Sequence, residues 1–136
     1  MKKTILLLSC IVLYFVSFGQ SYKSELKKLN AYLKVFNPET YRDIEVKDSM
    51  VNFKFQYYTQ IYTSSISIRD LKQNTTVLKG STLGEDEIKI KCKGENKCFY
   101  SNFSNDYTDH FRFFSSTVKD LTEIERLVNK FVKSLK

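Results

Sequence analysis

Residues 87–103 read EIKIKCKGENKCFYSNF, and the alternation in this stretch decides the fold class. From Ile88 to Cys92 every second residue is apolar and the residues between them are lysines, which is typical of a strand with one apolar and one charged face. The connection over 93–97 is rich in turn formers, and a second strand begins at Cys98. The pattern predicts a β-hairpin that brings the two cysteines close together.

Cys92 and Cys98 are expected to form a structural disulfide. The third cysteine, Cys10, lies in an N-terminal segment that we expect to be removed on export, and export delivers the chain to an oxidising compartment. A bridge that closes so short a loop contributes about 2 kcal/mol to stability. A redox pair or half of a metal site are the alternatives, but the spacing is not C-x-x-C and the chain has one histidine. We therefore expect no metal site and no cofactor.

Alternating apolar residues continue on both sides of the hairpin. The clearest run covers 51–57, and the expected turns on either side of it are Asp48-Ser49 and Thr59-Gln60. The sequence GSTLGE is expected to form a loop. Further strands are expected at roughly 43–47, 62–69, 75–79 and 108–115. Together with the hairpin they predict about seven antiparallel strands.

Two amphipathic helices are expected at the ends of the mature chain. Over 22–36 apolar residues recur every three or four positions between lysines, and Asn37-Pro38 ends the helix. The second helix begins near Thr117, a suitable N-cap residue, and continues to the C-terminus. Its apolar stripe consists of Leu121, Ile124, Leu127, Val128, Phe131 and Leu135.

This element order resembles that of the pleckstrin-homology-like roll over roughly 41–136. In that fold, two packed sheets are closed at one corner by a C-terminal helix. The resemblance implies an α+β protein, with an antiparallel β-roll or barrel of about seven strands and a C-terminal amphipathic helix. The helix over 22–36 is an addition to that roll and would cover an open sheet edge. A cystatin-like sheet wrapped on a helix is the alternative.

The N-terminus is expected to be a signal peptide over 1–19, followed by a single globular domain over 20–136. Two lysines precede an apolar run that is shorter than the roughly 20 residues needed to span a bilayer. Ser17 and Gly19 are small residues that suit cleavage before Gln20, which would leave no transmembrane segment. The alternatives are an uncleaved anchor and a lipoprotein attached through Cys10, but that cysteine lies inside the apolar run and does not close it.

The leader ending before Gln20 and the cysteine hairpin resemble small exported proteins of Bacteroidota. The likeness implies a periplasmic, cell-surface or extracellular location and no particular activity. Asp48-Ser49-Met50 also resembles the O-glycosylation site of such proteins, although a turn explains Asp-Ser equally well.

Composition excludes several classes of function. The net charge is +7, or +5 without Lys2 and Lys3, but the lysines are scattered and an exported protein seldom meets nucleic acid. The four glycines cannot form a G-x-G-x-x-G or a Walker loop, so we expect no nucleotide site. No feature indicates an oligomeric state.

The candidates for catalysis are few. Asp109 and His110 suggest a general base with an orienting carboxylate, but neighbours on a strand are expected to face opposite sides. No G-x-S-x-G motif accompanies them, and we interpret Glu85-Asp86-Glu87 as a solvated loop. We therefore expect that the protein is not an enzyme.

The remaining candidates are surfaces. Tyr58 and Tyr62 on an outer sheet face would stack on a sugar or anchor a peptide. Lys89, Lys91 and Lys93 share one face of a strand and would attract an anion. These features predict a non-catalytic binding or scaffold module with a protein or glycan partner. The alternatives are a secreted inhibitor or immunity-type protein acting through loops such as 80–86, and a small hydrolase in which Asp109, His110 or Glu85–Glu87 converge in one cleft.

Overall fold

The computed structural model describes residues 22–36, 40–78, 86–115 and 118–135. The predicted signal peptide, the Asn37-Pro38 helix stop, the 80–85 loop and the Thr117 cap lie outside the described residues. No helix within the described ranges is long and apolar enough to cross a membrane.

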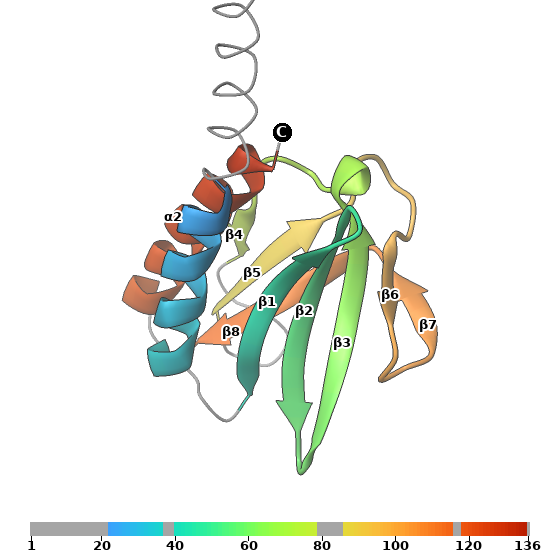
Figure 1. Cartoon of the computed structure of the whole chain (residues 1–136), viewed down its shortest axis with the longest axis horizontal. Coiled ribbons are helices and arrows are strands. Elements are labelled where there is room, and N and C mark those ends of the chain that lie inside the picture. Colours follow the sequence, from blue (N-terminus) through green and yellow to red (C-terminus); the bar gives the residue numbers. More distant parts are fainter. Residues whose placement is uncertain (1–21, 37–39, 79–85, 116–117, 136) are drawn as a thin grey trace, which may run out of the picture.

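The fold is α+β, with two helices and antiparallel strands arranged in two sheets (Figure 1). One sheet has five strands in the order β1-β2-β3-β6-β7, and the other has three in the order β4-β5-β8. No strand ladder among the described residues joins the two sheets into a closed barrel. The strands are β1 (Tyr41–Lys47), β2 (Met50–Tyr57), β3 (Gln60–Ser67), β4 (Thr76–Leu78), β5 (Asp86–Lys91), β6 (Phe99–Ser101), β7 (Asp106–Thr108) and β8 (His110–Ser115).

The predicted strand at 108–115 is present as β8 (His110–Ser115), but its start is wrong, because Thr108 ends β7, a strand of the other sheet. β7 pairs with β6 in the five-stranded sheet, whereas β8 pairs with β5 in the three-stranded sheet. The chain changes sheets at Asp109, the single residue between them. A change of sheet within one alternating run leaves the periodicity almost intact, so the pattern does not reveal it.

The predicted cysteine hairpin is also wrong in its pairing, although the disulfide is present. β5 and β6 belong to different sheets and do not pair with each other. Cys92 and Cys98 are bonded with a Cα–Cα distance of 5.9 Å, so the disulfide joins the ends of the two sheets. The Cys92 N–H donates to the Asp109 carbonyl at 3.1 Å, and the Cys98 N–H donates to the Thr108 carbonyl at 3.0 Å. The bridge therefore holds the segment in which the chain crosses between sheets.

The hydrophobic core confirms the predicted apolar faces of both helices. The helix over 22–36 buries Leu29 and Leu33, and α2 (Val118–Ser134) buries its predicted stripe except for Leu135, which is half-buried. Each fully buried Leu, Ile or Phe side chain contributes about 1.5–3 kcal/mol by leaving water. The sheets supply the other large side chains of the core, among them Val51, Phe53, Ile66, Ile88, Ile90, Phe99 and Phe113.

The helix over 22–36 lies beside α2, runs in the opposite direction and reaches the edge of β1 (Figure 1). The Asn30 side-chain amide donates to the Ile44 carbonyl and accepts from the Ile44 N–H, both at 2.8 Å. This amide satisfies two backbone groups that an edge strand leaves unpaired. The helix thereby covers an open sheet edge.

The two hairpin turns that flank β2 place non-glycine residues in the left-handed region. Asp48 and Ser49 have φ values of 50° and 61°, as a two-residue type I′ turn requires, which confirms the predicted turn. The second turn is Tyr58-Thr59 and not Thr59-Gln60, because β3 begins at Gln60. Tyr58 has a φ of 54°, a conformation that favours glycine and is uncommon for a tyrosine.

Candidate functional site

The β2–β3 hairpin extends beyond the three-stranded sheet and the helices at one end of the molecule (Figure 1). Antiparallel pairing places Phe55 opposite Tyr62, on the same face as the buried Phe53. The inner, core-directed face of the hairpin therefore continues into a region that no other strand covers. Aromatic side chains occupy this uncovered part.

Four aromatic residues in mutual contact form what we term the aromatic patch: Tyr57, Tyr58, Tyr62 and Phe103. The Tyr57 ring centroid lies 4.6 Å from that of Tyr58 and 5.1 Å from that of Phe103, and the Tyr62 centroid lies 4.8 Å from that of Phe103. Tyr58 is 82% exposed, and Tyr57 and Phe103 are each 50% exposed. Single exposed apolar residues are common on protein surfaces, but a cluster of them marks an interaction site.

The patch joins an open cleft of about 470 Å³ between the hairpin, the β6–β7 connection and the start of β8. Phe55 and Phe103 line the cleft, and the Phe55 ring also contacts that of Phe111 in a tilted arrangement with centroids 6.1 Å apart. The aromatic surface thus runs without a break from the core to solvent. The lining also includes the charged residues Lys97, Asp106, Asp109 and Arg112, together with the imidazole of His110.

Asp109 and His110 meet in this cleft, contrary to the expectation that they face opposite sides. The Asp109 Oδ1 lies 2.5 Å from the His110 Nδ1, because Asp109 lies in the break between β7 and β8 and does not follow strand alternation. The hydrogen bond to His110 holds the pKa of the Asp109 carboxyl below its usual value.

Arg112 completes the cluster. Its Nε donates a hydrogen bond to the His110 Nε2, which leaves the other ring nitrogen to donate to Asp109. The Arg112 Nη1 also lies 3.5 Å from the Glu87 carboxylate, which is only 3% exposed and is contacted by the Lys89 ammonium at 3.1 Å. Glu87 is therefore a buried strand residue and not part of a solvated loop.

This arrangement suits binding better than proton transfer. A general base needs a free lone pair, and Arg112 occupies the one on the His110 Nε2. Ser101 and Ser104 line the same cleft, but within the described part of the chain neither hydroxyl is hydrogen-bonded to His110. The described residues also hold no group of three His, Cys, Asp or Glu side chains able to bind a metal ion.

The structure separates the predicted surface residues into different regions. Tyr58 and Tyr62 belong to the aromatic patch, but Tyr62 lies on the inner face of the sheet and not on an outer face. Tyr58 does not point away from Tyr57; it lies in the turn and packs against it.

The three predicted lysines do not form one surface. Lys89 and Lys91 pair across the ladder with Arg112 and His110, on the face opposite the core. Lys93 lies beyond the end of β5, where its ammonium donates to the Arg69 carbonyl at the other end of the molecule. The alternation ends at Cys92, so Lys93 does not share the strand face of the other two.

Sequence reasoning missed Phe103 and Arg112. Phe103 lies in the polar turn segment SNFSN (101–105), where a large aromatic residue serves neither a strand nor a turn. A large aromatic residue in a polar turn is therefore a sequence signal that could have indicated a surface contact. Arg112 carries no comparable signal, because its role depends on the side chains of a neighbouring strand.

No family model, curated protein sequence or solved structure matches the chain. The functional interpretation therefore follows from the geometry of the site.

Proposed function

We propose that this protein is a non-catalytic binding module of the bacterial periplasm or cell surface, and that it holds its partner at the aromatic patch. The observation that carries the proposal is the run of ring contacts that joins Tyr57, Tyr58, Tyr62 and Phe103 at the end of the β2–β3 hairpin, where all of these residues except Tyr62 are at least 50% exposed. Tyrosine and phenylalanine bring large contact areas with few rotatable bonds, and such residues dominate the energetics of interfaces.

The partner that best fits this surface is a protein segment. The cleft beside the patch contains charges of both signs, with Lys97 and Arg112 near Asp106 and Asp109. An apolar centre bordered by polar groups of both signs is the usual anatomy of a protein interface. A glycan stacked on the tyrosine rings is the other ligand that the same experiment would detect.

Two further features support export and the proposed fold family. The disulfide suits an oxidising compartment, and the predicted leader over 1–19 would deliver the chain there. Two sheets followed by a C-terminal helix agree with a pleckstrin-homology-like roll, which we propose as the fold family. The likeness to small exported proteins of Bacteroidota belongs to the same proposal.

A small hydrolase is the second candidate, because Asp109 and His110 converge in a cleft that two serines also line. A serine-reactive fluorophosphonate probe tests it. Labelling of Ser101 or Ser104 that disappears in His110→Ala would favour the hydrolase, and absence of labelling would leave the binding module.

The proposal is tested by using the exported protein as bait for envelope extract of its own organism. We expect one retained protein, and we expect the variant Tyr58→Ala/Phe103→Ser to lose it. Val35→Ala is the matched control, because Val35 is 83% exposed on the helix over 22–36 and lies outside the patch. Equal retention by the patch variant and the control would exclude the patch as the site. A stable one-to-one complex with a toxin or enzyme would identify the inhibitor or immunity-type alternative.

A further inference from the structure

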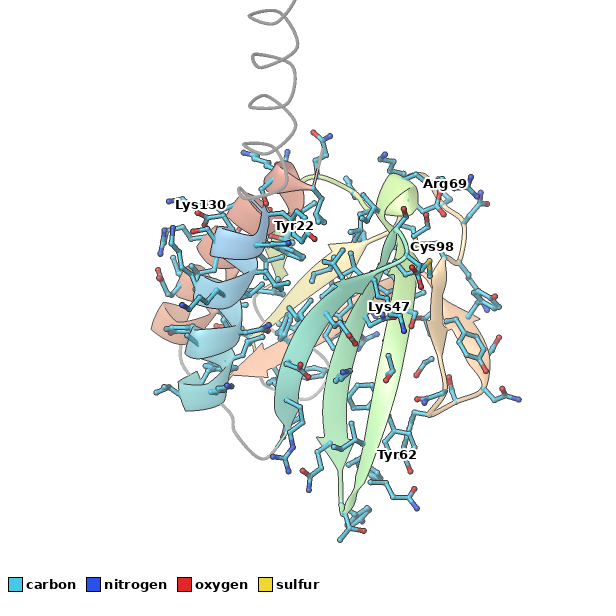
Figure 2. All side chains as sticks on the ribbon, viewed as in Figure 1. Tyr22, Lys47, Tyr62, Arg69, Cys98 and Lys130 are labelled. Atoms are coloured by element: carbon cyan, nitrogen blue, oxygen red, sulfur yellow. A yellow bond between two sulfur atoms is a disulfide. The ribbon has the colours of Figure 1, made fainter. Side chains whose placement is uncertain are left out.

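A second pocket lies at the opposite end of the sheets from the aromatic patch. It has a volume of about 470 Å³ and lies between the β1–β2 turn, the 3₁₀-helix η1 (Ile68–Asp70) and the C-terminal end of α2. Figure 2 shows the separation of the two ends, with Arg69 at one and Tyr62 at the other. We propose that this pocket binds a medium-chain fatty acid, with its carboxylate at a basic rim.

The apolar part of the pocket lining is aliphatic, and Ser49, Ser67 and Gln73 add neutral polar groups. Its apolar lining consists of Ile68, Leu71, Val132 and Leu135. Leu71 and Val132 are buried and form the base, whereas Ile68 and Leu135 are half-buried. Among the described residues no aromatic ring lines the pocket, so this lining offers no stacking surface for a sugar or a base. A flexible hydrocarbon chain is the occupant that such walls fit.

The size of the pocket limits the length of that chain. The volume falls within the range of about 300–1,000 Å³ that is usual for small-molecule sites. A group the size of a water molecule takes about 30 Å³, so the pocket has room for about 15 such groups. Decanoate fits within that limit.

The charges at the rim select an anionic head group. Arg69 and Lys93 are the only charged lining residues, and no carboxylate lines the pocket among the described residues. The Arg69 side chain is 86% exposed and lies 3.8 Å from Asp70, a separation too long for a tight ion pair. The guanidinium therefore remains available to a carboxylate. Arg69 and Lys93 line the same cavity as the four aliphatic residues.

The rim is held in place before any ligand binds. The Lys93 N–H donates to the Asp70 carbonyl at 2.7 Å, and the Lys93 ammonium donates to the Arg69 carbonyl. The backbone of Leu71 also pairs in an isolated antiparallel β-bridge with Cys92, which is one of the two disulfide-bonded residues. Such preorganisation lowers the entropic loss on binding. Because the carbonyl end of α2 carries a partial negative charge, the carboxylate is expected at Arg69 and Lys93 and the methyl end against Val132 and Leu135.

The test is an NMR titration of the protein with decanoate, kept below its micellar concentration. The protein is produced in a host that exports it and is used in the form that this host releases. We expect saturable shifts of the Ser67, Leu71 and Leu135 amides. Octanoate should bind on the order of tenfold more weakly, because it lacks two methylenes. Methyl decanoate, which has no charge, should also bind more weakly.

Paired variants separate the head-group site from general charge. Arg69→Ala/Lys93→Ala is expected to weaken decanoate binding at least fivefold. Lys27→Ala/Lys34→Ala removes the same charge from exposed positions on the helix over 22–36 and should leave binding unchanged. Equal weakening in both variants, shifts confined to the aromatic patch, or failure to saturate would each overturn the proposal. Loss of partner retention by the patch variant does not bear on it, because that variant leaves this pocket intact.

Discussion

The two ends of the molecule differ in shape and in chemistry. The hairpin end presents aromatic rings outward on a strand pair that no other strand covers, beside a cleft with charges of both signs. The pocket at the disulfide end is concave, its apolar lining is aliphatic, and the charged residues in its described lining are Arg69 and Lys93. A projecting patch fits the surface of a large partner, whereas a concave pocket encloses a small one.

The difference arises from how far the second sheet extends. Near the disulfide, the ends of both sheets and α2 meet, so the side chains there enclose a space. At the other end the tip of β2 and β3 extends beyond the other described strands, and the inward-facing Tyr57 is half-exposed there (Figure 1). The same alternating face of β2 is therefore buried in the core at Val51 and Phe53 and half-exposed at Tyr57.

Among the changes that test this comparison, removal of the disulfide should have the largest effect on stability. Cys92→Ala/Cys98→Ala is expected to lower the free energy of unfolding by about 2 kcal/mol, because the cross-link no longer restricts the unfolded chain. Amide hydrogen exchange should increase at Leu71, Lys93 and His110 more than in the β2–β3 turn. A uniform increase in the rate of amide exchange along the chain would show that the two ends do not unfold as independent units.

The next largest effects on stability are expected from two side-chain truncations, one at each end of the molecule. Phe103→Ala at the patch and Leu135→Ala at the pocket should each lower the free energy of unfolding by about 1 kcal/mol, because each side chain is only partly buried. Phe103→Ala is expected to lose the protein partner and keep decanoate, and Leu135→Ala to do the reverse. Loss of both ligands in either variant would mean that the sites are coupled. Thermal unfolding provides the control for folding.

The two turns offer a smaller and more selective comparison. Ser49→Gly should raise the free energy of unfolding by about 0.5–1 kcal/mol, because glycine adopts a positive φ without strain. Tyr58→Gly relieves the same strain but removes the ring contact with Tyr57, worth about 0.5–1.5 kcal/mol, so its net effect on stability should be close to zero. Denaturant unfolding of both variants measures the difference. A clear destabilisation by Ser49→Gly would contradict the type I′ turn.

Removal of the Asp109–His110 contact should have the smallest effect on stability. Since this contact lowers the folded-state pKa of Asp109, its contribution to stability is present above the ordinary aspartate pKa and is lost as the pH falls through the lowered value. The Asp109 side chain is mostly exposed, so we expect a difference of a few tenths of a kcal/mol at most. An NMR titration should show the Asp109 inflection moving to higher pH in His110→Ala. An unchanged inflection would show that the hydrogen bond does not form in solution.

The candidate site was only partly predictable. Tyr58 and Tyr62 are predicted as a surface because tyrosines on an outer sheet face suit stacking on a sugar or anchoring a peptide. Their placement on the inner face depends on where the opposite sheet ends, and that is a property of the whole fold. Asp109 and His110 are predicted to point apart because neighbours on one strand face opposite sides. The one-residue break between β7 and β8 brings them together, and it does not disturb the apolar alternation that follows, so the sequence does not reveal it.

Local patterns in the sequence determined the helices, most of the strand positions, the Asp48-Ser49 turn and the disulfide. These depend on side-chain periodicity and short-range chemistry, which lie within a few residues of each other in the chain. Only the tertiary structure decided that β5 and β6 belong to different sheets, and that Phe103 and Arg112 line the same cleft. Strand pairing and the length over which two sheets overlap are non-local, so the periodicity of one strand does not specify them.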